Sequence, residues 1–142
     1  MEIWQALLQR ANYSFNHNLW AQAEEYYHQA IECLEEKWRD DIENVALLQA
    51  WVGAFHHLAI LYEEQSKPRI AFRYLQIPHQ RMTEISQHPA YSDEFQFIAL
   101  RFLKSTLTPL LEFSKKHPAC DSCLASLQKM AVEVAARQPI LH

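Results

Sequence analysis

Two stretches of the chain decide its fold: residues 11–31, ANYSFNHNLWAQAEEYYHQAI, and residues 59–79, AILYEEQSKPRIAFRYLQIPH. Each begins with an alanine that is followed twelve positions later by a second alanine, and four positions further on by a large residue, Tyr27 or Leu75. The four alanines are Ala11, Ala23, Ala59 and Ala71. Small residues let two antiparallel helices approach closely, and a large residue can fill the space beside the contact. The two stretches therefore predict two helical hairpins.

Helical periodicity continues along almost the whole chain, because apolar residues recur three and four positions apart. The predicted helices span about residues 2–16, 18–38, 41–65, 66–87, 92–116 and 119–137. They form three antiparallel hairpins in one all-α domain of residues 1–142: hairpins 2–38 and 41–87, and a degenerate hairpin 91–138. Nothing in the sequence indicates an interdomain linker.

Several residues are predicted to shape these helices. Asn18, Asp40, Ser66 and Ser92 are predicted to cap the starts of four of them, since short polar side chains accept hydrogen bonds from free backbone N–H groups. Pro78 should kink the fourth helix rather than end it, because the apolar pattern continues beyond it. The third helix carries apolar residues on two sides and is expected at the centre of the fold.

Composition excludes several classes of function. The chain has 142 residues, 49% of them apolar, and a formal charge of −4 without a basic cluster, which argues against nucleic-acid binding. It has a single glycine, Gly53, whereas phosphate loops, dinucleotide fingerprints and nucleophile elbows need at least two. We therefore expect no enzyme activity and no cofactor.

The same totals bear on the compartment. No uninterrupted apolar run approaches 18 residues, and the first residues lack the basic and apolar regions of a secretory signal, so neither a membrane span nor secretion is expected. The three cysteines, an odd number, suit reduced thiols. These features predict a cytoplasmic protein.

The alanine pattern resembles the tetratricopeptide repeat, a helical-hairpin family. The family's small residues match Ala11, Ala23 and Ala30, then Ala59 and Ala71; its large residues match Leu7 and Tyr27, then Phe55, Leu58, Tyr62 and Leu75. Arg10 and Ser14 stand where the family prefers leucine and tyrosine, Pro78 replaces a small residue, and the period is 48 residues, from Ala11 to Ala59, rather than ~34. The competing interpretation is an irregular six-helix bundle whose alanine spacing is coincidental.

The resemblance implies a right-handed superhelical array with a groove lined by the first helix of each hairpin. Such a groove binds a protein or peptide segment without catalysis, as a scaffold or adaptor does. The groove positions carried over are Gln5, Leu8, Asn12, Phe15 and Asn16, then Gly53, His56, Ile60, Glu63 and Glu64. We also expect that Asn12 and His56 can both be replaced by alanine without loss of the fold.

Three other interpretations come from other classes of protein. His117, Cys120 and Cys123 could hold a metal or act as a redox pair, but a zinc site needs four ligands, and packing of the thiols in the core is the preferred interpretation. Glu25 and His28 have the spacing of di-iron bundles, but the second copy of that motif is missing. The chain could also be an obligately oligomeric structural subunit, such as a homodimer, because its last predicted helix ends in an apolar sequence.

Overall fold

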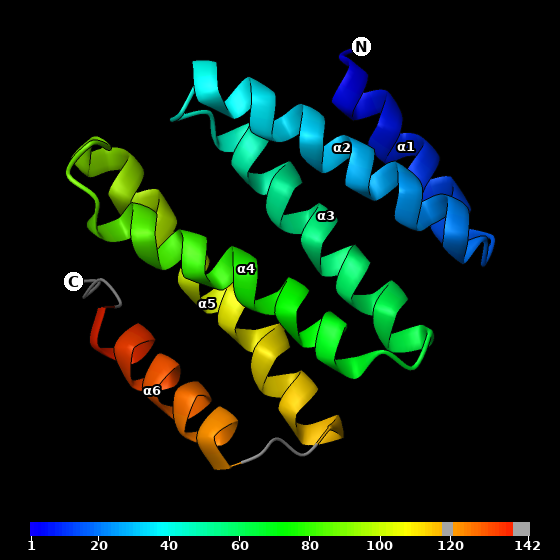
Figure 1. Cartoon of the computed structure of the whole chain (residues 1–142). Helices are drawn as coiled ribbons and strands as arrows, with labels where there is room; N and C mark the ends of the chain where they lie inside the picture. The colour runs from blue at the N-terminus through cyan, green and yellow to red at the C-terminus, as the bar shows by residue number, and fades with distance from the viewer. Residues whose placement is uncertain (118–120, 138–142) are drawn as a thin grey trace. The chain divides into compact units, whose positions relative to one another are not determined.

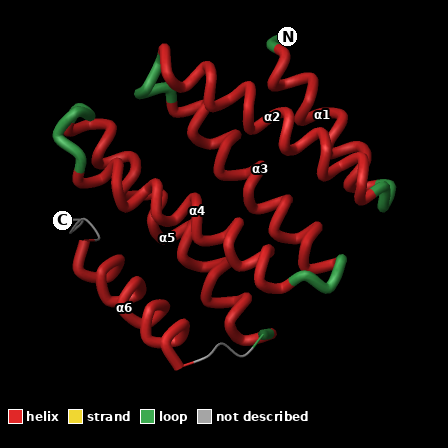
Figure 2. Tube along the Cα trace, viewed as in Figure 1, coloured by secondary structure: helices red, strands yellow, loops and turns green. Residues whose placement is uncertain are grey.

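The computed structural model describes residues 1–117 and 121–137, and all secondary structure within them is α-helical (Figures 1 and 2). The helices are α1 (Ile3–Asn16), α2 (Trp20–Asp40), α3 (Val45–Glu64), α4 (Pro68–Gln87), α5 (Asp93–Lys116) and α6 (Asp121–Arg137). The described residues contain no strand. The prediction of an all-α chain with six helices is thus confirmed.

The chain divides into two compact units, Met1–Tyr74 and Leu75–His142, where the sequence had indicated one domain. The division lies inside α4 and so cuts through the second predicted hairpin. Helix α4 continues through Pro78, which confirms that this proline does not end it. The bend expected at Pro78 remains a prediction.

In the first unit, α1 and α2 form an antiparallel hairpin, and α3 runs beside α2 in the direction of α1 (Figure 1). The four alanines that suggested the hairpins are buried, with exposed fractions of 0% for Ala11, Ala23 and Ala71 and 4% for Ala59. Tyr27, the large residue of the first stretch, is also 0% exposed. The residues singled out by their spacing therefore belong to the core.

The turn between α1 and α2 is closed by two backbone hydrogen bonds. Asn18 donates its N–H to the carbonyl of Phe15 at 3.2 Å, and Leu19 donates to the carbonyl of Ser14 at 2.9 Å. Asn18 has a φ of 59°, in the left-handed region. This is a Schellman ending of α1, so the prediction of Asn18 as the N-cap of the next helix is wrong: Leu19 holds that place.

The turn between α3 and α4 repeats this geometry 48 positions later. Ser66 donates its N–H to Glu63 at 3.0 Å, Lys67 donates to Tyr62 at 2.9 Å, and the φ of Ser66 is also 59°. Ser66 therefore terminates α3 instead of capping α4, and that prediction is wrong too. The repeat seen in the sequence is thus present in the backbone of both turns.

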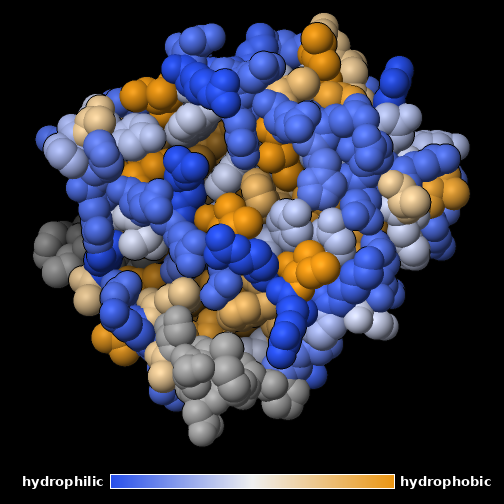
Figure 3. All heavy atoms as spheres, in the orientation of Figure 1, coloured by the Kyte–Doolittle hydropathy of each residue, from blue (hydrophilic) through white to orange (hydrophobic). Residues whose placement is uncertain are grey.

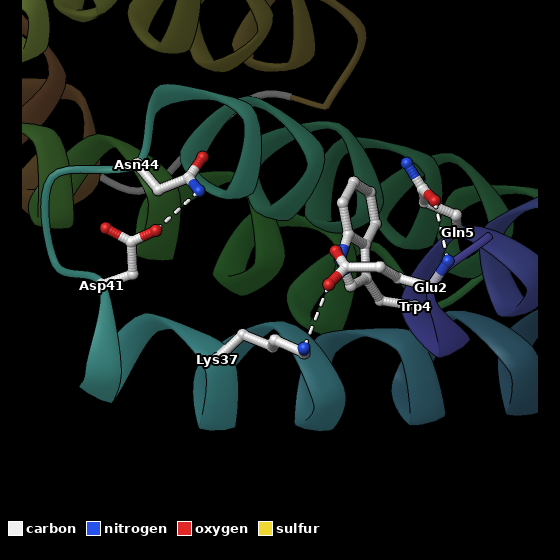
Figure 4. Close-up of polar contacts among 6 residues, drawn as sticks. All are labelled: Glu2, Trp4, Gln5, Lys37, Asp41 and Asn44. Carbon is white, nitrogen blue, oxygen red and sulfur yellow. Dashed lines mark hydrogen bonds and ion pairs between the residues drawn. The ribbon is translucent and has the colours of Figure 1, made fainter.

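Helix α3 starts later than predicted. Its N-cap is Asn44, whose Oδ1 accepts the N–H of Leu47 at 3.1 Å, and whose amide donates to Asp41 at 2.9 Å (Figure 4). The predicted cap, Asp40, is instead the last residue of α2. Ser92 does cap α5 as predicted, accepting the N–H of Phe95 at 3.1 Å.

Helix α3 is the most buried helix of the first unit, as its two apolar stripes predicted. Ten of its residues are buried: Leu47, Leu48, Trp51, Val52, Ala54, Phe55, Leu58, Ala59, Leu61 and Tyr62. Among the described residues, α3 alone is long and apolar enough to cross a membrane, by length and composition only, with a mean hydropathy of 1.4 over 18 residues. The absence of a long uninterrupted apolar run in the sequence had not indicated this. Since 56% of that window is buried inside the protein, its apolar character serves the core.

In the second unit, α5 packs against α6. His79 of α4 and Thr106 of α5 form a buried polar pair, with 2.8 Å between His79 Nδ1 and Thr106 Oγ1. The Thr106 hydroxyl donates to backbone carbonyls of its own helix, so His79 Nδ1 donates to Thr106 Oγ1. His79 is therefore a titratable side chain buried inside the second unit.

Candidate functional site

Asn12 is an exposed residue of α1 whose side chain is held by a buried one. The hydroxyl of Tyr27, on α2, donates to Asn12 Oδ1 at 2.5 Å. Burial raises the pKa of Tyr27 far above its ordinary value, so its hydroxyl keeps its proton and remains the donor. The bond therefore leaves the two N–H donors of the Asn12 amide at the surface, where a carbonyl oxygen of a partner can accept them.

Because of this bond, replacing Asn12 with alanine would affect the stability of the protein as well as the binding of a partner. Removing the Asn12 side chain would leave the Tyr27 hydroxyl buried without an acceptor, and such a group costs about 1–3 kcal/mol. The expectation that Asn12 can become alanine without loss of the fold stays a prediction, but the bond indicates that this substitution would lower stability. Asn12→Asp is the better probe, since it keeps the acceptor oxygen and removes the N–H donors.

Phe15 and His57 join α1 to α3. Their rings meet edge to face with centroids 5.2 Å apart, while His57 stacks on Tyr27 at 5.3 Å. His57 Nδ1 lies 2.9 Å from the carbonyl of Gly53, which can only accept, so this nitrogen carries the proton. The sequence singled out His56 to face α1, but the contact with Phe15 is made by His57.

Ten of the twenty residues of α3 are not buried, and we call the five of them at the predicted groove positions the α3 stripe. They are Gly53, His56, Ile60, Glu63 and Glu64. Ile60 is 45% exposed, although it belongs to a strongly apolar helix. On the face drawn in Figure 3, hydrophobic residues emerge in separate small groups among hydrophilic ones. An exposed isoleucine of this kind offers a partner one apolar anchor rather than a broad patch.

Three features of the α3 stripe lower the stability of the helix. Glycine inside a helix costs about 1 kcal/mol relative to alanine. Glu63 and Glu64 place negative charge in the last turn, where the helix dipole disfavours it, whereas α2 and α5 carry basic residues there. His56 has a buried Nε2 atom for which the described residues provide no hydrogen-bond partner. Residues that reduce stability and gather on one side of a helix are typical of functional surfaces.

We predict that Gly53→Ala stabilises the protein by about 1 kcal/mol, because alanine restricts the unfolded chain and favours the helix. A Cβ atom at position 53 would meet nothing within 4 Å, so the substitution adds no clash. Urea unfolding followed by tryptophan fluorescence measures the gain. Ala46→Gly, at an exposed position of the same helix, is the reciprocal control and should destabilise by a similar amount. A loss of stability in Gly53→Ala would contradict the prediction.

His56 has an unusual environment for a surface position. Burial, and then the neighbouring His57, lower the pKa of His56, so the ring is neutral at pH 7. Its unpartnered Nε2 atom is inaccessible to solvent and therefore cannot contact a partner directly. His56 contributes the remainder of its ring to the α3 stripe.

The other predicted groove residues have different surroundings. Gln5 accepts the N–H of Glu2 at 2.9 Å and so completes the start of α1 (Figure 4). Glu2 is also bound by Trp4 Nε1 at 2.6 Å and by Lys37 at 3.0 Å, which ties the start of α1 to the end of α2. Leu8 is half-buried and Asn16 is exposed at the last position of α1. Asn12, Phe15 and Asn16 together with the α3 stripe form what we call the α1–α3 face.

A polar network between α2 and α3 was missed by the sequence analysis. Tyr62 donates to Glu24 at 2.7 Å, Gln65 donates to the same carboxylate at 3.2 Å, and His28 Nε2 lies 3.1 Å from the Tyr62 hydroxyl. Burial acts to raise the pKa of Glu24, but the bonds from Tyr62 and Gln65 outweigh it and the pKa is lowered. The i, i+4 spacing of Glu24 and His28 was the signal, although the sequence analysis paired Glu25 with His28.

The residues of the metal hypothesis are only partly described. His117 follows α5 and its ring lies 4.5 Å from that of Phe113, measured between centroids. Cys120 lies outside the described residues, as does the side chain of Cys123. Among the residues that the structure does describe, no three histidine, cysteine or acidic side chains gather in a way that could hold a metal ion.

Comparison with known proteins identifies the family to which the chain belongs. No curated protein and no solved structure matches it. The model of the family described as "Protein of unknown function (DUF2753)" matches residues 2–142, nearly the whole length, and the chain therefore belongs to this family.

Proposed function

We propose that the protein is a non-catalytic binding module of the cytoplasm, which holds a segment of a partner protein on the α1–α3 face. The proposal includes the arrangement of its hairpins as a tetratricopeptide-like array. The main support is the α3 stripe, where a glycine inside the helix and negative charge in its last turn both disfavour the helix on the exposed side of α3. A surface kept at such a cost is explained by a partner that uses it.

The chemistry of the face suits an extended peptide. Asn12 is held by Tyr27 with its amide donors outward, in the orientation that a main-chain carbonyl requires. Ile60 and the half-buried Phe15 supply apolar contact area, which dominates the energetics of most interfaces. The open space above Gly53 lets the main chain of a partner approach the helix closely.

A photo-crosslinking amino acid placed at position 60 would test where a partner docks. The control is the same amino acid at Phe97 of α5, which is 44% exposed against 45% for Ile60. In extracts of the native cell, we expect a defined adduct from position 60 and none from position 97. Equal adducts at both positions, or none at position 60, would refute binding at the α1–α3 face.

We predict that Asn12→Asp weakens the binding of the crosslinked partner at least tenfold, which is about 1.4 kcal/mol. The aspartate still accepts from Tyr27 but presents a carboxylate oxygen to the carbonyl of the partner. Fluorescence anisotropy measures the affinity, and circular dichroism checks the fold. Gln128→Glu, an exposed amide-to-acid change on α6, is the matched control and should bind like the unchanged protein.

A further inference from the structure

An open cavity of about 380 Å³ lies between α1 and α2. We call it the α1–α2 cavity, and its lining residues are Gln9, Arg10, Tyr13, Ser14, Gln22 and Tyr26. It shares no residue with the α1–α3 face. Its volume falls within the range of small-molecule sites, about 300–1,000 Å³.

The internal repeat explains why this cavity exists. Ser14 and Tyr26 of the first hairpin correspond, 48 positions later, to Tyr62 and Tyr74 of the second. Tyr62 and Tyr74 stack with centroids 5.2 Å apart and an angle of 7° between the rings. In the first hairpin Tyr26 is present, but a serine stands where its stacking partner would be. The α1–α2 cavity therefore occupies the place of a missing aromatic ring.

A second difference between the hairpins adds a positive charge to the α1–α2 cavity. Arg10 corresponds to Leu58, which is 0% exposed and belongs to the core of the second hairpin. Arg10 is exposed at the cavity and forms no ion pair within the described part of the chain. The first hairpin has thus exchanged an apolar core residue for an unpaired guanidinium, which binds carboxylate and phosphate groups in a bidentate way.

Other polar groups line the same cavity. Ser14 is only 2% exposed as a residue and brings a hydroxyl group to the lining of the cavity. The amides of Gln9 and Gln22 add donors and acceptors on either side. Two tyrosines, a guanidinium and several hydrogen-bonding groups surround a space large enough for one planar ring.

We propose that the α1–α2 cavity binds a small ligand that consists of a planar ring with an anionic group, either carboxylate or phosphate. The ring takes the place that Tyr62 holds in the second hairpin and stacks on Tyr26. The anionic group pairs with the guanidinium of Arg10. This site is independent of the proposed peptide-binding face.

Three probes of similar size test the proposal: phenyl phosphate, benzoate and the uncharged benzamide. Each is titrated into the ¹⁵N-labelled full chain, and amide shifts report the affinity and the place of binding. We expect shifts of residues 9–14 and 22–26 with both anions, and binding at least about tenfold weaker for benzamide, because it lacks the charge-assisted bond. Shifts with phenyl phosphate alone would assign the site to phosphates, and shifts with benzoate alone to carboxylates.

Two variants separate the charge from the shape of the site. Arg10→Gln should reduce anion binding at least about tenfold, while Arg69→Gln, at another exposed arginine of the first unit, should not change it. Ser14→Tyr should restore the tyrosine of the second hairpin, fill the cavity and abolish binding of all three probes. Should Ser14→Tyr not fold, Arg10→Gln alone decides, since this exposed side chain is not part of the core.

Several outcomes would overturn the proposal. One is that none of the three probes shifts residues 9–26 at millimolar concentration. Another is that benzamide binds as well as benzoate, or that Arg10→Gln leaves anion binding unchanged, which would remove Arg10 from the site. Loss of binding in Arg69→Gln equal to that in Arg10→Gln would show only nonspecific attraction of anions.

Discussion

Replacing Tyr27 with alanine is expected to lower the free energy of unfolding of the first unit by about 3–5 kcal/mol, the usual cost of removing a buried aromatic side chain. Tyr27 is 0% exposed, stacks on His57 and donates to Asn12. Its removal would leave a cavity where all three helices α1, α2 and α3 contribute contacts. All four tryptophans belong to this unit, so tryptophan fluorescence in a urea titration measures the effect directly.

Tyr27→Phe separates packing from hydrogen bonding at the same position. Phenylalanine keeps the ring and its stacking but loses the hydroxyl, and we expect a loss of only about 1 kcal/mol. The same variant releases the Asn12 amide, so it should also weaken partner binding without a large change in stability. Equal losses for the alanine and phenylalanine variants would show that the ring contributes little, contrary to the packing described here.

Lowering the pH from 7 to 5 is expected to destabilise the second unit through His79. Burial lowers the pKa of His79 below its ordinary value of 6.5, and the nearby Glu133 only partly opposes this effect. The unfolded chain therefore binds a proton more readily than the folded one. The contribution of neutral His79 to the free energy of unfolding is fully present above about pH 6.5, the pKa of histidine in the unfolded chain. It is lost as the pH falls toward the lower pKa of His79 in the folded protein, by up to about 2 kcal/mol at pH 5.

The division of the chain lets each unit be followed separately. Hydrogen exchange of peptides from α5 reports the second unit, which contains no tryptophan. His79→Leu should flatten the pH dependence of this exchange, while Thr106 keeps its bonds to backbone carbonyls. His88→Leu, at an exposed histidine of the same unit, should leave the dependence as it is. An unchanged acid response in His79→Leu would contradict the assignment.

His56 should give the first unit a weaker acid response of the same sign. Its pKa is lowered by burial and by His57, but its ring is partly exposed, so solvent screening reduces the effect on stability. Between pH 7 and 5, Glu24 does not contribute, because its lowered pKa keeps it ionised throughout. Tryptophan fluorescence therefore reports the titration of His56 without interference from that carboxylate.

The parts of the fold that the sequence predicted depend on local periodicity. Ala11 and Ala23 are in the core because small residues at helix crossings recur with helical spacing, and α3 is buried because apolar residues line two of its sides. Asn18 and Ser66 were assigned to the wrong helix end. A short polar residue can cap the start of one helix or accept a left-handed φ at the end of another, and only the backbone of the turn decides.

The site was harder to predict, because it depends on the rotation of each helix and on pairs from different helices. His56 and His57 point about 100° apart around α3, and packing decides which of them meets Phe15. The bond from Tyr27 to Asn12 joins residues 15 positions apart on different helices, so no local pattern reveals it. The α1–α2 cavity did leave a signal, since Ser14 departs from the tyrosine that its repeat partner carries.

The two short turns have a consequence for the speed of folding. Three residues separate α1 from α2, and three separate α3 from α4, so each hairpin closes a very short loop. Short loops lose little entropy on closure, and chains rich in local contacts fold in microseconds to milliseconds. Each turn is fixed by backbone bonds within six residues, so it forms before distant parts of the chain meet. Folding of the chain can thus begin at either turn, and the two turns serve as alternative nuclei.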